Sequence, residues 1–185
     1  MGYQHKIKDE LRIIIFFIAS IWVVFLLDIF LPLEQFGLRP RTARGITGIV
    51  AMPFLHADFR HIMSNTPPLL ILLSLLAGSR ANSKTIVFII ILLAGILLWL
   101  FGRGNALHIG ASGLVFGLAG FLIASGIIEK RPLPLLISLI VGLIFGASLL
   151  SGILPTQKSV SWDGHLFGLV AGAVTAWGLL NFRGK

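Results

Sequence analysis

Six long runs of apolar residues, separated by short polar connections, divide this chain of 185 residues. The runs cover about residues 13–33, 59–77, 86–101, 112–128, 133–154 and 164–181. A helix of about 20 apolar residues crosses the roughly 30 Å hydrocarbon core of a bilayer, and these runs are close to that length. The pattern predicts an all-α membrane protein with six transmembrane helices. Residues 13–182 would form one domain after a polar N-terminal segment, residues 1–12.

The connection between the first two runs, residues 34–55, differs from the others. It carries Arg39, Arg41 and Arg44 and then an apolar stretch, residues 46–54. That stretch is too short and too interrupted by glycine to span a membrane. We expect it to lie in the membrane interface.

Composition and charge support the membrane assignment. The chain is 56% hydrophobic and only 12% charged, with a mean hydropathy of +0.96, whereas soluble domains are about 25% charged. The net charge of +8 comes from basic residues in the short connections, and no Lys/Arg-rich run indicates nucleic-acid binding. Nine of the 15 basic residues fall on the side that holds both termini. This asymmetry predicts cytoplasmic termini.

Helix lengths place several polar residues at one depth. Ser112 to Ile128 gives about 25 Å of helix, and His165 to Leu180 gives about 24 Å, both measured from the inner surface. The second helix brings His61 to a similar level, with Asn65 one turn deeper. Three helices are therefore predicted to place four polar side chains in one layer of the outer leaflet.

Two rows of glycine predict a close approach of the fourth and sixth helices. Their three- and four-residue spacing is typical of tight helix crossing in membranes. The rows are Gly113, Gly117 and Gly120, and Gly164, Gly168 and Gly172. By itself this spacing indicates only packing, but it would bring Ser112 within reach of His165.

These residue types fit nucleophilic catalysis. Ser112 would be the nucleophile and His165 the general base that takes its proton. Asp58 and Asp163 are expected near the surface, so we predict a dyad without a carboxylate. His61 and Asn65, on one helix face, would stabilise the oxyanion. The polar residues His56, Asn105 and His108 are expected to line a water-filled opening to the outside.

The complete set resembles the rhomboid family of intramembrane serine proteases. The matching segments are His56-x-x-x-x-His61-x-x-x-Asn65, Gly110-Ala111-Ser112-Gly113 and Gly164-His165-x-x-Gly168-x-x-x-Gly172. The resemblance covers essentially the whole chain and suggests the minimal six-helix form of a bacterial cytoplasmic membrane.

The resemblance implies a Ser112–His165 dyad, with His61 and Asn65 in the oxyanion hole. Gly110, Gly113, Phe116, Gly168 and His56 would support the site. It also implies cleavage of transmembrane protein substrates near small residues, from a site open to the outer side. The fifth helix and the loop before the sixth would admit substrate. Expected partners are these substrates and the lipid bilayer, with no cofactor, metal or nucleic acid.

Two positions depart from the family pattern. Phe116 stands where many relatives carry a tyrosine that stacks on the catalytic histidine, so stacking would be kept and a hydroxyl lost. The Trp-Arg pair common in the first loop is missing. Arg39-Pro40-Arg41 precedes the interfacial stretch instead.

Two alternatives remain open at this level. A rhomboid-like protein could hold membrane clients without cutting them, although such a binder needs neither Ser112 nor His165. A metal or haem site could use His56, His61, His108 and His165, since neutral imidazoles bind Zn, Cu or Fe. No carboxylate or thiol joins them in the membrane, and the five-residue step from His56 to His61 does not suit one helical face.

Overall fold

The computed structural model describes residues 3–80, 82–156 and 160–181. Its long helices are α1 (Tyr3–Asp28), α3 (Phe59–Ser79), α4 (Ser83–Phe101), α5 (Ser112–Glu129), α6 (Pro132–Gly152) and α7 (Trp162–Asn181). Each contains a segment long and apolar enough to cross a membrane. The predicted all-α architecture with six spanning helices is confirmed. Residue 182 and the basic residues Lys158, Arg183 and Lys185, which entered the predicted domain end and charge asymmetry, lie outside the described residues.

Helices α3 to α7 begin and end within three residues of the expected spans, but the first helix differs. It starts at Tyr3, inside the predicted polar segment, and ends at Asp28 instead of residue 33. The Asp28 carboxylate accepts hydrogen bonds from the backbone N–H groups of Leu33, at 2.6 Å, and Glu34, at 3.2 Å. These bonds stabilise a turn, so residues 29–33 leave the helix.

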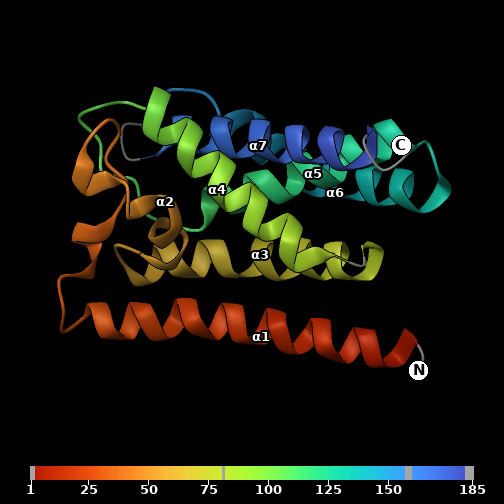
Figure 1. The fold of residues 1–185 in the computed structure, drawn as a ribbon, viewed down its shortest axis with the longest axis horizontal. Coiled ribbons are helices and arrows are strands. Elements are labelled where there is room, and N and C mark those ends of the chain that lie inside the picture. The colour runs from red at the N-terminus through yellow and green to blue at the C-terminus, as the bar shows by residue number, and fades with distance from the viewer. Residues whose placement is uncertain (1–2, 81, 157–159, 182–185) are drawn as a thin grey trace.

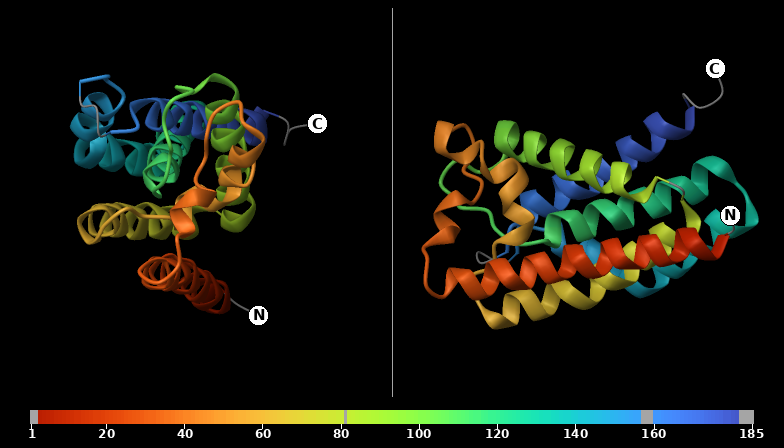
Figure 2. Two further views of the ribbon diagram at one scale, coloured as in Figure 1. Left: turned by 90° about the vertical axis from the view of Figure 1, so that its left-hand side faces the viewer. Right: turned by 60° about the horizontal axis from the view of Figure 1, so that its bottom comes forward.

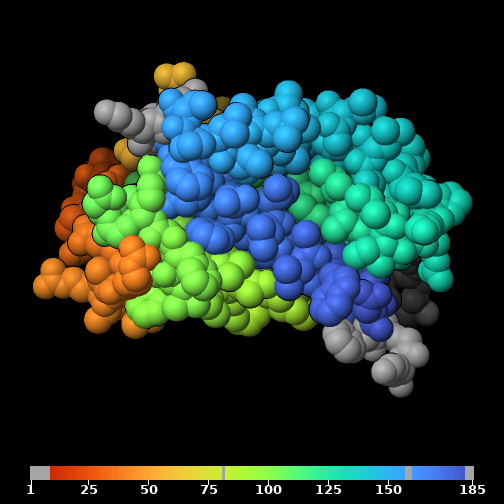
Figure 3. Space-filling view, turned by 90° about the horizontal axis from the view of Figure 1, so that it is seen from above, coloured from red at the N-terminus to blue at the C-terminus, as the bar shows by residue number. Residues whose placement is uncertain are grey.

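Helix α5 lies at the centre of the bundle. It packs most extensively against α7 and next against α6, and it also contacts α3 and α4. In Figure 1, α1 begins and α7 ends at the same end of the bundle, and α1 lies at its edge beside α3. Figure 2 shows the same peripheral position of α1 from two other directions. In the space-filling view of Figure 3, the blue α7 lies between the green α4 and the teal α6.

Glycine makes the α5–α7 crossing possible. A Cβ atom added at Gly168 would collide with the backbone carbonyl of Gly113, and one added at Gly172 would collide with that of Gly117. The two backbones therefore touch directly, as small-residue spacing permits in membrane helices. By contrast, a Cβ at Gly142 or Gly146 of α6 would meet nothing within 4 Å. Those two glycines do not serve close packing.

The connection before α3 folds into short helical pieces that meet the loop between α4 and α5. These pieces are η1 (Leu33–Phe36), η2 (Ala43–Gly45), α2 (Gly48–Ala51) and η3 (Met52–Phe54). Leu38 and His108 exchange backbone hydrogen bonds of 2.8 and 3.0 Å. The Arg41 guanidinium donates to the carbonyls of Leu100 and Gly102. These bonds fix the first loop without the usual Trp-Arg pair.

Candidate active site

Ser112 and His165 meet at the starts of α5 and α7. Ser112 Oγ lies 2.9 Å from His165 Nε2, and His165 Nδ1 lies 3.0 Å from the Gly152 carbonyl oxygen. A carbonyl can only accept, so Nδ1 must carry the ring proton. Nε2 of the neutral ring is then free to accept from the serine hydroxyl. This is the arrangement in which an imidazole can take a proton from serine.

Phe116 fixes the plane of the imidazole. Its ring lies parallel to that of His165, with 4.1 Å between centroids and 9° between planes. A Cβ at Gly152 would collide with the Phe116 ring and would lie 3.1 Å from His165 Nδ1. The end of α6 therefore closes over the stacked pair.

Gly110 shapes the turn that leads into Ser112. Its φ is +112°, a conformation that suits glycine because it lacks a Cβ. An added Cβ would lie 2.5 Å from His61 Nε2, so the His61 ring packs directly on this backbone. His61 is thereby held beside the segment that carries the serine.

His56, which follows the first loop in the chain, supports the same segment. It is 1% exposed, and its Nε2 accepts from the Ala111 backbone N–H at 3.4 Å. Burial lowers the pKa of His56 to about 4, with a further contribution from nearby His61, against an opposing effect of the Phe54 carbonyl. His56 is consequently neutral at physiological pH and able to accept this bond.

Asn65 lies one turn along α3 from His61 and is buried, at 6% exposure. Its side-chain nitrogen donates to the His61 carbonyl oxygen at 2.9 Å. An amide nitrogen carries two protons, so one donor remains for another acceptor. The structure thus brings His56 and His61 to the segment that precedes Ser112, and Asn65 lies one turn along α3 from His61.

Asp163 lies in the first turn of α7, where the sequence places it near the membrane surface, and its side chain is buried in the protein, at 2% exposure. Its carboxylate accepts from the Arg103 backbone at 2.9 Å and from the Arg103 guanidinium at 3.0 Å. The loop that carries Arg103 therefore covers the start of α7, which position along the helix alone could not show.

His108 belongs to the same cluster. It is 1% exposed, and its Nδ1 lies 2.7 Å from Ser161 Oγ, which also lies 3.4 Å from the Asp163 carboxylate. Burial lowers the pKa of His108, although Asp163 opposes the shift. His108 therefore joins two loops. The sequence had suggested that it lines an opening to water, but its side chain is buried. His56, although equally buried, lines an open cavity of about 560 Å³ together with Arg39 and Asp58. Asn105 is exposed.

Several groups in this region could not be found from the sequence pattern. The Gly152 carbonyl that orients His165 is a backbone atom, so no side-chain pattern could reveal it. Arg103 and Ser161 lie in loops, and only the fold brings them to Asp163. In the described part of the chain, no three His, Cys, Asp or Glu side chains converge as metal ligands.

Removing the Asp163 carboxylate should destabilise the fold. We expect Asp163→Ala to lower the free energy of unfolding by about 3 kcal/mol, because a buried ion pair loses one partner. Thermal unfolding of the purified protein in detergent measures this. As a control, Arg12→Ala removes an exposed pair with Asp9, with the Arg12 side chain 79% exposed, and should change the free energy by less than about 1 kcal/mol. Equal losses in both variants would contradict the assigned role of Asp163.

Comparison with known proteins agrees with this arrangement. The rhomboid domain matches residues 43–182, which is 140 of 185 residues. The chain belongs to the rhomboid family. It is 40% identical over 176 residues to an uncharacterized protein of Mycobacterium tuberculosis, covering 89% of this chain and 72% of that protein. An uncharacterized protein of Mycobacterium leprae is 33% identical over 196 residues, and the match covers 96% of this chain and 77% of that protein.

Membership in the rhomboid family and the six candidate spans make this a multi-pass membrane protein. The matched region contains α3, α5 and α7, the three helices that carry His61, Asn65, Ser112 and His165. The segments that suggested a rhomboid in the sequence are thus the ones that meet in space.

Proposed function

We propose that this rhomboid is an intramembrane serine endopeptidase that cleaves transmembrane protein substrates with a Ser112–His165 dyad. The hydrogen bond of 2.9 Å between Ser112 Oγ and His165 Nε2 carries this proposal. The Nδ1 contact with the Gly152 carbonyl supports it further, because it leaves Nε2 unprotonated and ready to act as base.

In the proposed reaction, Ser112 Oγ attacks the carbonyl carbon of the scissile bond while its proton moves to His165 Nε2. The imidazolium that forms keeps its Nδ1–H bond to Gly152 and then protonates the departing amine. A water molecule, deprotonated by the same nitrogen, then attacks the acyl-enzyme ester and releases Ser112. The Gly152 carbonyl takes the orienting place that a carboxylate holds in a triad.

Negative charge develops on the substrate carbonyl oxygen during both attacks. We assign its stabilisation to His61 and Asn65 of α3 and to the backbone N–H of Ser112 at the start of α5. Donors fixed by a folded helix need no reorganisation when the charge appears, which makes such donors effective. His56, Gly110 and Gly113 support this geometry by holding the segment before and after Ser112.

We further propose that the enzyme lies in a bacterial cytoplasmic membrane with both termini inside, and that its site opens to the outer side. The substrate bond would follow a small residue, and α6 with the segment before α7 would admit the substrate. These assignments rest on the family resemblance and on the distribution of basic residues.

A fluorophosphonate probe tests the proposal directly, since it reacts only with an activated serine. We expect the purified protein in detergent to be labelled at Ser112, identified by mass spectrometry of the labelled peptide. His165→Ala should reduce the labelling rate by about 10³-fold or more. Absence of labelling in the unmodified protein would contradict the endopeptidase and favour a rhomboid-like binder of membrane clients.

A further inference from the structure

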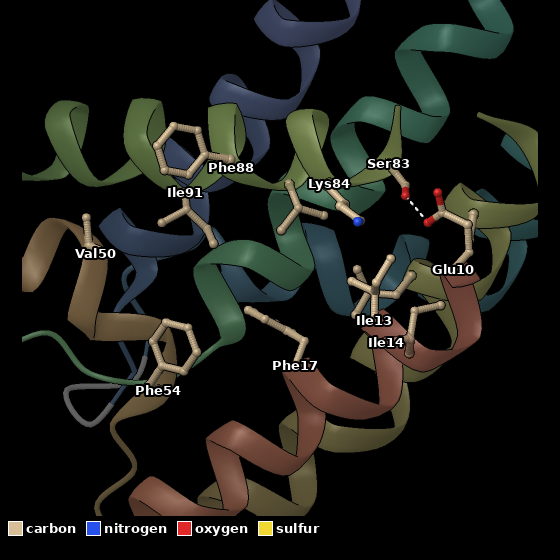
Figure 4. Close-up of a pocket in the computed structure, with 13 residues that line it drawn as sticks. Glu10, Ile13, Ile14, Phe17, Val50, Phe54, Ser83, Lys84, Phe88 and Ile91 are labelled. Carbon is tan, nitrogen blue, oxygen red and sulfur yellow. Dashed lines mark hydrogen bonds between the residues drawn. The ribbon is translucent and has the colours of Figure 1, made fainter. Parts of the chain in front are cut away.

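A groove runs along the membrane face of the bundle between α1, α3 and α4, remote from the Ser112–His165 pair. Helix α1 packs chiefly against α3 and η3, which leaves a lateral opening towards α4. The groove has a volume of about 320 Å³ and is lined almost entirely by apolar side chains. Ile14, Leu73 and Ile91 are buried in it, while Val50 and Phe88 are exposed at its rim. Figure 4 shows these side chains, with Val50 and Phe54 closing one end.

The other end of the groove is polar. Glu10 and Lys84 are the charged residues among those that line it, and Ser83 donates a hydrogen bond to the Glu10 carboxylate. In Figure 4 the three polar side chains gather at this end, opposite Phe54. The groove therefore has a polar mouth, with one acid and one base, and an apolar trough.

The length of the trough follows from the helices that form it. Lining residues extend from Glu10 to Phe17 on α1, a distance of seven residue steps, and from Ser83 to Ile91 on α4, a distance of eight. At 1.5 Å per residue, these segments are about 10 Å and about 12 Å long. Both helices start at the same end of the bundle, so their polar residues share one membrane boundary.

The trough is apolar and opens towards the membrane between α1 and α4. A hydrocarbon chain can enter, and the bilayer that surrounds a multi-pass protein supplies such chains.

The polar mouth selects the headgroup. The Lys84 ammonium would attract a lipid phosphate, and the Glu10 carboxylate would accept a hydrogen bond from a primary amine. A phosphoethanolamine headgroup carries both groups, whereas phosphoglycerol carries the phosphate without the amine. We propose that the groove binds one acyl chain of a phosphatidylethanolamine molecule from the leaflet that borders the start of α1, with its headgroup between Lys84 and Glu10. This site is independent of the proposed protease activity.

Native mass spectrometry of the whole protein, released from nanodiscs, tests the site. The nanodiscs would contain equal amounts of phosphatidylethanolamine and phosphatidylglycerol with identical chains. We expect the unmodified protein to retain one phosphatidylethanolamine molecule. Val87→Trp, which fills the trough, should abolish retention, whereas Leu139→Trp on the exposed face of α6 should leave it unchanged.

Headgroup variants keep the test decisive if Val87→Trp does not fold. Glu10→Gln should remove the preference for phosphatidylethanolamine, and Lys84→Gln should weaken retention of both lipids about threefold, the effect of one exposed ion pair. Arg131→Gln, on the exposed arginine that directly precedes α6, is the matched control and should change neither. Equal retention of the two lipids by the unmodified protein would overturn the proposal. Loss of bound lipid in every variant, the two controls included, would overturn it too. So would a dimer of this chain that carries no bound lipid.

Discussion

We expect Ser112→Ala to abolish cleavage of a transmembrane reporter substrate, lowering the rate by a factor on the order of 10⁴ or more. The reason is chemical, because the methyl group of alanine has no lone pair with which to form the acyl-enzyme. The substitution removes one oxygen that bonds only to His165 Nε2 among the contacts described. Unfolding temperature should therefore change little. Gel analysis of substrate cleavage in proteoliposomes measures the effect.

Ser125→Ala is the matched control for this experiment. Ser125 lies on the same helix, α5, and is 1% exposed, yet its hydroxyl has no hydrogen-bond partner among the described residues. Replacing an unsatisfied buried hydroxyl by a methyl group costs no hydrogen bond. This variant should keep full activity and unchanged or slightly higher stability. Cleavage by Ser112→Ala at the rate of Ser125→Ala would refute the role of Ser112.

Gly168→Ala is the second substitution with a large expected effect. The added Cβ would collide with the backbone carbonyl of Gly113, one residue after Ser112. Neither the Cβ nor the carbonyl can move aside by a side-chain rotation. Helix α7 must shift away from α5, which carries His165 away from Ser112. We expect the free energy of unfolding to fall by about 1–3 kcal/mol, as for an overpacked core. Cleavage should fall at least tenfold.

Gly178→Ala separates this packing effect from a general effect of alanine in α7. A Cβ at Gly178 would meet nothing within 4 Å, so no neighbour has to move. Alanine also favours a helix over glycine by up to about 1 kcal/mol. Gly178→Ala should thus retain activity and stability. Thermal unfolding and reporter cleavage, measured on Gly168→Ala and Gly178→Ala, separate the two effects. Normal cleavage by Gly168→Ala would show that the close crossing is not required.

Local sequence patterns predicted some features of the site and missed others. The spacing of His61 and Asn65 places them on one face of a helix, and the glycine rows predict a close crossing, which the collisions at Gly168 and Gly172 demonstrate. Local patterns did not show that Asp163 is buried within the protein. A residue at the start of α7 lies near the surface in depth, but the Arg103 backbone and guanidinium cover it from another part of the chain.

The sequence by itself determined the membrane class, the number of spanning helices and the residue types available for catalysis, because apolar run length and helical period are local properties. Only the tertiary structure decided which atoms meet. The Gly152 carbonyl that fixes the His165 tautomer, the burial of Asp163 against Arg103, and the groove between α1 and α4 each depend on segments far apart in the chain. Their positions follow from how the helices pack around α5, and that packing is set by contacts across the whole bundle.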